Sequence, residues 1–216
     1  MSTTFNQKLK PANWRRVSLD WGLFLILAIA IKLNLTSGLD QSFTHLITAF
    51  QSSSRTTIFN WLTWSGSPII TLAGCLLLAL VYILREQLLQ AAIILLTIVS
   101  GDGFAWLFKM LIQRPRPLAT ETISQGFSFP SAHMVGAIIL VSLLCHYWHP
   151  ANHRYRVLQV LIGFSWVALV GLSRIYLQAH FATDVLGGML LGWTCWRTVT
   201  VVIPMVINRH LQRIDS

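Results

Sequence analysis

Long apolar runs separated by short polar stretches organise this chain of 216 residues. Each run approaches the roughly 20 residues that a helix needs to cross about 30 Å of hydrocarbon. Tryptophan and tyrosine stand near the ends of several runs, as in the aromatic belts at membrane interfaces. The pattern therefore predicts an all-α integral membrane bundle of six transmembrane helices. The six runs cover about 19–35, 68–84, 88–108, 133–148, 157–173 and 183–206.

The composition favours a membrane protein over a soluble one. Of the residues, 54% are hydrophobic and 11% are charged, and the net charge is +9, whereas a soluble domain carries about 25% charged residues. The lysines and arginines stand singly at the ends of apolar runs and form no basic stripe of the kind that binds nucleic acid. We therefore expect no nucleic-acid partner, and we interpret the charge as a determinant of topology and lipid contact.

The three cysteines, Cys75, Cys145 and Cys195, each lie inside an apolar run. Apart from the adjacent Cys145 and His146, none has a second cysteine or a histidine at metal-ligand spacing. We expect small buried thiols, with neither a disulfide nor a zinc site.

Basic residues in the polar segments predict the orientation of the bundle. With six spans, both tails and the second-to-third and fourth-to-fifth connections lie on one side, and all four contain lysine or arginine. The positive-inside rule makes that side cytoplasmic. A short amphipathic helix is expected near 40–51. The expected parts are a cytoplasmic tail over 1–18, one membrane domain over 19–206 with outer loops at about 36–67, 109–132 and 174–182, and a cytoplasmic tail over 207–216.

The first apolar run has two interpretations. Its basic leader and the small residues Thr36, Ser37 and Gly38 that follow it resemble a cleaved signal peptide. A membrane anchor is favoured, because the basic segment is long, no A-x-A cleavage site is evident, and cleavage would leave an odd number of spans.

The first of three polar segments runs from Lys109 to Pro117, at the outer end of the third span. Pro115 and Pro117 stop the helix and stiffen the loop that carries Arg116. A guanidinium donates two parallel hydrogen bonds to phosphate, and a lysine adds a compact charge. The alternative is a basic flank that only ends the span, but the positive-inside rule disfavours such a flank on the outer side.

The second segment, from Pro130 to His133, opens the fourth span. Ser131 is a good N-cap, and the free N–H groups of a helix N-terminus form a ready anion site. His133 lies in the first turn and would face the same space. An ordinary helix cap beside an interfacial histidine is the alternative.

The third segment joins the fifth and sixth spans and begins with Ser173 and Arg174. His180 and Asp184 are four residues apart, so they share one helical face. The carboxylate can accept a hydrogen bond from one imidazole nitrogen, which leaves the lone pair of the other nitrogen available as a nucleophile. A carboxylate within the membrane is costly and indicates a functional role, although a structural His–Asp pair is the alternative.

Together the three segments resemble the signature motifs of the type 2 phosphatidic acid phosphatase (PAP2) superfamily, whose phosphate site is similar to that of vanadium haloperoxidases. The resemblance implies a PAP2/haloperoxidase-like core. At one position the chain departs from the family pattern, because Ala132 stands where the family usually has glycine and adds a methyl group near the phosphate. The matching motifs are Lys109-x6-Arg116-Pro117, Pro130-Ser131-x-His133 and Ser173-Arg174-x5-His180-x3-Asp184.

The resemblance also implies a role for each motif residue. His180, oriented by Asp184, would attack phosphorus and form a phosphohistidine. His133 would protonate the leaving oxygen and then activate water. No acidic cluster suited to Mg²⁺ is evident in the sequence, so we expect neither a metal nor another cofactor. The residues implied to bind the phosphate oxygens are Lys109, Arg116, Ser131 and Arg174, with a backbone N–H near Ala132.

The expected activity is dephosphorylation of a membrane lipid that carries a phosphate or diphosphate, at the extracytoplasmic face. The resemblance to small bacterial members of the family implies a bacterial cytoplasmic membrane, and it suggests undecaprenyl diphosphate, phosphatidylglycerophosphate or phosphatidic acid as the substrate. Two other functions stay open, namely transfer of the phosphate to another lipid and a carrier or permease that binds lipid phosphate without hydrolysis. The pair of His180 and Asp184 favours an enzyme, because binding alone needs no oriented nucleophile. The sequence leaves the oligomeric state open.

Three further charged residues lie near the motifs. Asp102 lies in the third span about two turns deeper than Lys109. We hypothesise that it supports the site through a salt bridge to a motif cation, with pairing elsewhere in the bundle as the alternative. Arg114 nearly duplicates Arg116 and could assist in binding the phosphate, but the spacing favours Arg116, so Arg114, like Asp102, is expected to support the site from behind the residues that contact the phosphate. Glu121, in the outer loop, is interpreted as solvated rather than as part of the pocket.

Overall fold

The structure, a computed structural model, describes residues 14–117, 126–148 and 150–214, and residues 207–214 only by their backbone. Every regular element in these ranges is an α-helix, which confirms the all-α prediction. The eight helices of the described ranges are α1 (Trp14–Lys32), α2 (Ser37–Thr48), α3 (Ser53–Ser65), α4 (Pro68–Leu84), α5 (Leu88–Ile112), α6 (Ala132–Tyr147), α7 (His153–Tyr176) and α8 (Ala182–Ile214).

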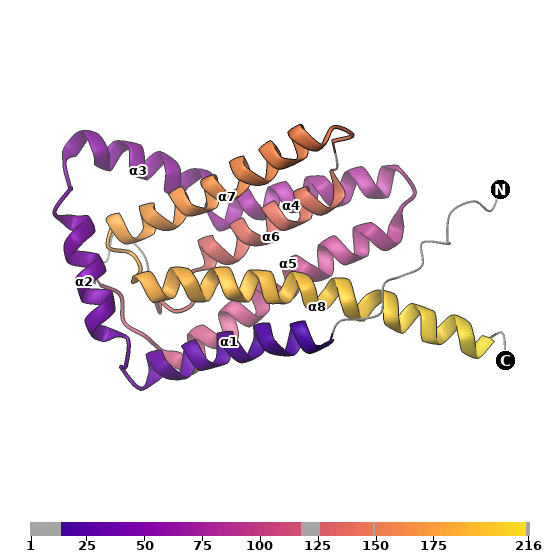
Figure 1. Ribbon diagram of the computed structural model, residues 1–216, viewed down its shortest axis with the longest axis horizontal. Helices are drawn as coiled ribbons and strands as arrows, with labels where there is room; N and C mark the ends of the chain where they lie inside the picture. The colour runs from indigo at the N-terminus through magenta and orange to yellow at the C-terminus, as the bar shows by residue number, and fades with distance from the viewer. Residues whose placement is uncertain (1–13, 118–125, 149, 215–216) are drawn as a thin grey trace.

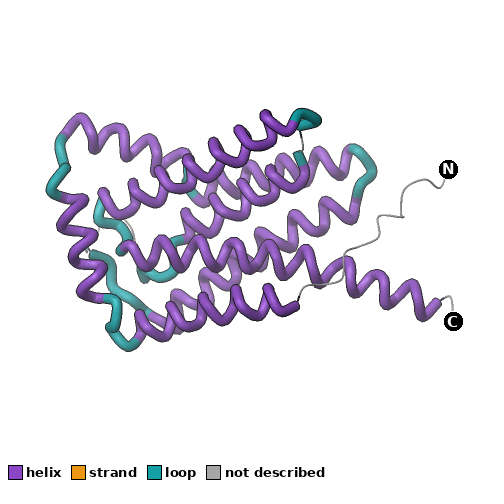
Figure 2. Tube along the Cα trace, in the orientation of Figure 1, coloured by secondary structure: helices purple, strands orange, loops and turns teal. Residues whose placement is uncertain are grey.

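Most helices run along the long axis of the molecule, and α2 crosses one end of the bundle (Figure 1). The chain bends by 88° between α1 and α2. The connection from α7 to α8, and the described parts of that from α5 to α6, lie at the same end as α2 (Figure 2). The start of α1 and the end of α8 lie at the opposite end. One end of the bundle therefore gathers segments that are far apart in the sequence.

Two glycines allow α8 to lie directly against α6, which also contacts α4, α5 and α7. A Cβ atom at Gly188 would lie 2.5 Å from the carbonyl oxygen of Ser131, and one at Gly192 would lie 2.7 Å from that of Val135. Larger side chains would push the two helices apart. This close approach brings the start of α6 to the start of α8, where two of the three polar segments lie.

Several helices are long and apolar enough to cross a membrane. Among the described residues, four segments meet this test, namely Ser53–Leu84, Leu88–Ile112, His153–Tyr176 and Ala182–Val206. The bent pair of α1 and α2 would supply a fifth if it forms one span, and α6 is apolar but shorter. These lengths support an integral membrane protein, and the count of six spans stays a prediction.

The segment 36–67 differs most from the sequence prediction. It contains α2 and the whole of α3, rather than a loop with one short helix. Helix α3 begins at Ser53 because the hydroxyl of Ser52 accepts a hydrogen bond from the N–H of Arg55 at 3.4 Å. Since more than half of the residues in this helix are polar, a search for apolar runs does not detect it. Helices α3 and α4 together form one long candidate span, Ser53–Leu84.

Two of the predicted spans also end later than expected. Helix α5 continues through Lys109 to Ile112, where Gln113 adopts a left-handed conformation with φ of 54° and ends it. Helix α7 continues through Arg174 to Tyr176. Both cations therefore project from rigid helical turns rather than from loops, which fixes their positions more closely.

Candidate active site

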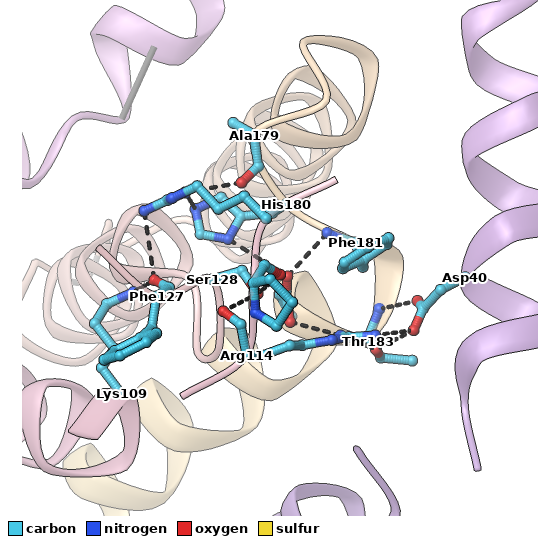
Figure 3. Close-up of polar contacts among 12 residues, drawn as sticks. Asp40, Lys109, Arg114, Phe127, Ser128, Ala179, His180, Phe181 and Thr183 are labelled. Carbon is cyan, nitrogen blue, oxygen red and sulfur yellow. Dashed lines mark hydrogen bonds and ion pairs between the residues drawn. The ribbon is translucent and has the colours of Figure 1, made fainter. Parts of the chain in front are cut away.

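The three polar segments meet near α2. The backbone N–H of Ser131 donates to the carbonyl oxygen of Asp184 at 3.1 Å, and Figure 3 shows Lys109 and Arg114 of the first segment near His180 of the third. His133, in the first turn of α6, interacts electrostatically with cations from α5, α7 and the loop after α5, and with His180. The structure thus brings together all the residues that the motifs single out, from four helices and two connections. These residues are Lys109, Arg116, Ser131, Ala132, His133, Arg174, His180 and Asp184.

Contacts with the body of the bundle fix the segment that precedes α6. The backbone N–H of Ser128 donates to the carbonyl oxygen of Arg114 at 2.8 Å. The ring of Phe129 is fully buried and stacks on Phe24, with the ring centroids 5.9 Å apart. The ring also packs on Gly187 of α8, where a Cβ atom would collide with it. These contacts hold the start of α6 against the first turns of α8.

The carboxylate of Asp184 lies beside the imidazole of His180, and both side chains are buried. Nδ1 of His180 lies 3.6 Å from Oδ2 of Asp184, which is longer than a hydrogen bond. The backbone N–H of Phe181 donates to the same Oδ2 at 2.9 Å and holds the carboxylate in place. Asp184 therefore acts on the ring mainly through its charge in this structure.

The other imidazole nitrogen of His180 faces Arg116. Nη1 of Arg116 lies 3.2 Å from Nε2 of His180. A guanidinium has no acceptor, so this contact requires a lone pair on Nε2 and leaves the proton of the neutral ring on Nδ1. That tautomer directs the N–H toward Asp184 and the lone pair of Nε2 away from it.

Burial lowers the pKa of His180 from 6.5 to about 4. The neighbouring Asp184 opposes this shift, and the cations of Arg174 and Arg116 add to it. The imidazole is therefore neutral at neutral pH, and its Nε2 lone pair is available for attack.

Backbone carbonyl groups hold two of the motif cations in place. Nζ of Lys109 donates to the carbonyl oxygen of Phe127 at 2.7 Å. Arg116 donates from Nε to the carbonyl oxygen of Gly126 at 3.0 Å and from Nη1 to that of Ala179 at 2.8 Å. Burial lowers the pKa of Arg116, and Asp184 opposes the shift. These contacts direct both side chains into the site.

Two further groups at the site are buried without a hydrogen-bond partner among the described residues, namely Nε of Arg174 and the hydroxyl of Ser131. Nη1 of Arg174 makes one long contact, at 3.5 Å, with the hydroxyl of Thr63 on α3. Ser131 directly precedes α6, whose first N–H groups are free of intrahelical partners. Because buried donors are costly when unpaired, this corner suits an anion with several oxygen acceptors.

Arg114 lies behind the His–Asp pair, in the supporting position suggested for it from the sequence. It binds two carboxylates, since Nη2 lies 2.6 Å from Oδ2 of Asp40 and Nη1 lies 2.7 Å from Oδ1 of Asp184. Its Nη1 also donates to the hydroxyl of Thr183 at 2.8 Å. The side chain thus supports the His–Asp pair, rather than being free to bind a phosphate. Asp40 was not identified from the sequence. It is an acidic residue in an amphipathic helix, and no sequence motif around it indicates that Arg114 is its partner.

Asp102 forms no ion pair within the described part of the chain, so the hypothesised salt bridge to a motif cation is not present. The buried face of α5 passes through Gly101 and Ala105, and Asp102 lies on the exposed side. Adjacent side chains on a helix point about 100° apart, so Asp102 faces away from the side on which Gly101 is buried. Glu121 lies outside the described residues.

Comparison with protein families identifies a match over more than half of the chain. The family model described as "PAP2 superfamily" matches residues 88–207. This range contains all three polar segments and begins at α5. The matched region therefore contains α5, α6 and α7, and it contains α8 as far as residue 207.

A curated relative and two solved structures each resemble about three quarters or more of this chain. Phosphatidylglycerophosphatase B of Bacillus subtilis (strain 168) is 27% identical over 173 residues, which cover 78% of this chain and 85% of the relative. The crystal structure of a transmembrane PAP2-type phosphatidylglycerolphosphate phosphatase from Bacillus subtilis superposes with a TM-score of 0.69 and 26% identity, over 85% of this chain and 93% of that one. Aquifex aeolicus LpxE shares the fold, with a TM-score of 0.57 and 24% identity over 74% of this chain and 94% of its own.

Proposed function

The chain belongs to the PAP2 superfamily, and from this membership we propose that it hydrolyses a lipid phosphate through a phosphohistidine on His180. It is a phosphatase embedded in a membrane, as its relatives and its apolar helices indicate. The observation that carries the mechanism is the imidazole of His180. It lies between the carboxylate of Asp184, 3.6 Å from Nδ1, and the guanidinium of Arg116, 3.2 Å from Nε2.

Binding of the substrate phosphate replaces weaker contacts in the site. Lys109 and Arg116 donate to neutral carbonyl groups in this structure, and a phosphate dianion is a stronger acceptor for both. Arg174 and Ser131 contribute buried donors that are unpaired among the described residues. Phosphoryl transfer depends mainly on positioning and charge stabilisation, and three cations beside a helix N-terminus provide both.

The first chemical step forms a bond between Nε2 of His180 and phosphorus, and it breaks the bond between phosphorus and the lipid oxygen. The leaving oxygen takes a proton from the imidazolium of His133, whose protonated form the bound dianion favours. The ring of His180 becomes positively charged when it carries phosphate, and the negative charge of Asp184 stabilises it.

Water completes the reaction in a second step. His133, now neutral, accepts a proton from water as the water oxygen attacks phosphorus. The bond between phosphorus and Nε2 of His180 breaks, and inorganic phosphate leaves. Both steps draw their stabilising charge from Lys109, Arg116 and Arg174, so the proposed mechanism requires no metal ion.

A phosphate monoester of a glycerophospholipid is the proposed substrate class, with phosphatidylglycerophosphate as the first candidate. The names of the Bacillus subtilis relatives support this choice. Phosphatidic acid and undecaprenyl diphosphate are the other candidates. In each case the apolar part of the substrate stays among the membrane helices while the phosphate reaches the cations.

We propose six spans, with both tails on the cytoplasmic side of a bacterial cytoplasmic membrane and the site on the outer side. Under this proposal the bent pair of α1 and α2 supplies one span and α6 another, in addition to the four long segments. The membrane domain covers 19–206, between tails at 1–18 and 207–216. The support is the distribution of basic residues at the predicted cytoplasmic ends.

The proposed function is tested by phosphate release from the three candidate lipids in mixed micelles that contain EDTA. Purified wild-type protein is compared with His180→Ala and with Asp20→Asn, a control that removes one partner of an ion pair with Arg197. We expect release by wild type and by the control but not by His180→Ala. A carrier would release no phosphate from any of these lipids, and activity that disappears with EDTA would contradict the metal-free mechanism.

A further inference from the structure

Asp40 is a buried carboxylate on α2, the helix at the right of Figure 3, and its side chain points toward Arg114 and Thr183. Its side chain is 1% exposed, and no sequence motif includes it. Its side chain contacts Arg114, in the connection after α5, and Thr183, at the start of α8. A buried charge is costly unless it is paired. The proposed chemistry gives Asp40 no role.

Two of the Asp40 contacts are those of a helix cap supplied by another helix. Oδ1 accepts the backbone N–H of Thr183 at 3.0 Å, and Oδ2 accepts the hydroxyl of the same residue at 2.7 Å. Thr183 is the second residue of α8, so its N–H has no intrahelical acceptor. These contacts alone would make Asp40 a structural residue, and an uncharged asparagine would cap the helix nearly as well.

The third contact involves charge and leads toward the nucleophile. The guanidinium of Arg114 bridges two carboxylates, with 2.6 Å to Oδ2 of Asp40 and 2.7 Å to Oδ1 of Asp184. Its Cζ also lies 4.2 Å from the ring centroid of Phe181. The forked guanidinium geometry lets one side chain hold both acceptors at once, which joins α2 to the residue that lies beside His180.

The charge of this group of three residues depends on Asp40. Two carboxylates and one guanidinium leave a net charge of −1 beside the imidazole. Without the charge of Asp40, Arg114 would neutralise Asp184 fully, and the net charge would be zero. The negative excess is what can orient the Nδ1 proton of His180 and stabilise the positive phosphohistidine ring.

We propose that Asp40 is a positioning residue for the nucleophile: by sharing Arg114, it leaves Asp184 the negative charge that orients His180. The inference rests on the proposed function for its kinetic consequence, but its structural consequence does not depend on turnover. Asp40 touches neither the phosphate site nor the imidazole, and it acts through Arg114 and Asp184.

The test compares Asp40→Asn with the double variant Asp40→Asn/Arg114→Gln. The single change keeps the cap on Thr183 and brings the net charge of the group to zero. The double change also removes the guanidinium and restores −1. We expect Asp40→Asn to lower kcat about tenfold to a hundredfold, by analogy with the loss of residues that orient metal-bound histidines, with KM within about threefold. The double variant should recover at least about threefold in kcat.

A spectroscopic measurement supplies a readout that does not require activity. In ¹⁵N-histidine NMR spectra at neutral pH, with the signals of His180 assigned from their loss in His180→Ala, wild type should show the tautomer with the proton on Nδ1. Asp40→Asn should shift population toward the Nε2–H tautomer, and the double variant should shift it back. Asp20→Asn, which breaks an ion pair remote from this group, should change neither kcat nor the tautomer.

The outcomes separate this inference from the proposed function. A wild-type protein without phosphatase activity would contradict the proposed function, while the tautomer shifts would still decide the role of Asp40. Unchanged kcat and tautomer in Asp40→Asn would overturn the inference and leave the phosphatase activity intact. A double variant that is no better than the single one, or failure of both to fold, would show that Asp40 is only structural and would also overturn it.

Discussion

Nη1 of Arg116 lies 3.2 Å from Nε2 of His180, so a guanidinium covers the nitrogen that we propose as the nucleophile. The same guanidinium donates to the carbonyl oxygens of Gly126 and Ala179. These neutral acceptors are weaker than a phosphate oxygen. Arg116 can therefore transfer to the substrate and uncover Nε2 as the phosphate arrives, which couples substrate binding to exposure of the nucleophile.

Replacement of Arg116 should lower activity strongly. Arg116→Ala removes a donor to the phosphate and should reduce kcat/KM about 100- to 1,000-fold, as loss of one transition-state donor does. Steady-state phosphate release measures the effect. Arg55→Ala is the matched control, because Arg55 is exposed and its Nη1 donates to the carbonyl oxygen of Phe50. Equal losses of kcat/KM in the two variants would contradict a role for Arg116 in binding the substrate phosphate.

Activity should persist in mildly acidic solution. The pKa of His180 is lowered to about 4 by burial, and attack requires the unprotonated Nε2. At about pH 5.5 an imidazole with an ordinary pKa of about 6.5 would be about nine-tenths protonated, whereas that of His180 stays neutral. The acidic limb of kcat/KM should therefore lie near pH 4, after correction for the substrate phosphate, whose second pKa is about 6.

The pH profile has a clear contrary result. A corrected limb near pH 6.5 would mean that the nucleophile has an ordinary pKa. The profile of an active control such as Arg55→Ala should coincide with that of wild type, because Arg55 is exposed and its hydrogen bonds are with Ser52 and Phe50 rather than with the imidazole.

The motif chemistry could be predicted from the sequence, because each segment contains the reacting group and its partner at fixed spacing. His180 and Asp184 lie one helical turn apart, and the structure has both side chains buried and adjacent. Lys109 and Arg116 both point into the same end of the bundle. Local geometry therefore determined which side chains share a face, and the apolar runs determined which end of each helix they occupy.

The contacts between distant segments could not be predicted in this way. Asp40 lies 74 residues from Arg114 and 143 from Thr183 in the sequence, and no spacing rule connects them. Helix α3 was hidden for a different reason, since its polar residues lower its hydropathy, and its place is determined by tertiary contacts such as that of Thr63 with Ser173, at 2.6 Å.

The close contact of α6 and α8 should be sensitive to one methyl group. Gly188→Ala would place a Cβ atom 2.5 Å from the carbonyl oxygen of Ser131, so the helices must separate at the site. We expect a loss of about 1–3 kcal/mol in the free energy of unfolding and a loss of activity. Thermal unfolding and phosphate release measure both. Gly103→Ala, where a Cβ atom meets nothing within 4 Å, should retain both properties.

The proposed orientation predicts opposite labelling at the two ends of the bundle. In a variant without the three native cysteines, Ser53→Cys at the start of α3 should react with a membrane-impermeant maleimide in intact cells. Glu86→Cys, in the connection from α4 to α5, should react only after permeabilisation. Both positions are exposed, so access to reagent decides the result. The reverse labelling pattern would contradict an outer site.

The most direct test of the account is capture of the covalent intermediate. Wild-type protein is mixed with a lipid labelled with radioactive phosphate and quenched in alkali within one turnover, and the label on the protein is measured before and after acid treatment. The account predicts an alkali-stable, acid-labile label that is present in wild type, present in Asp20→Asn and missing from His180→Ala. Label that persists in His180→Ala, or phosphate release by that variant at the wild-type rate, would contradict the assignment of His180 as the nucleophile.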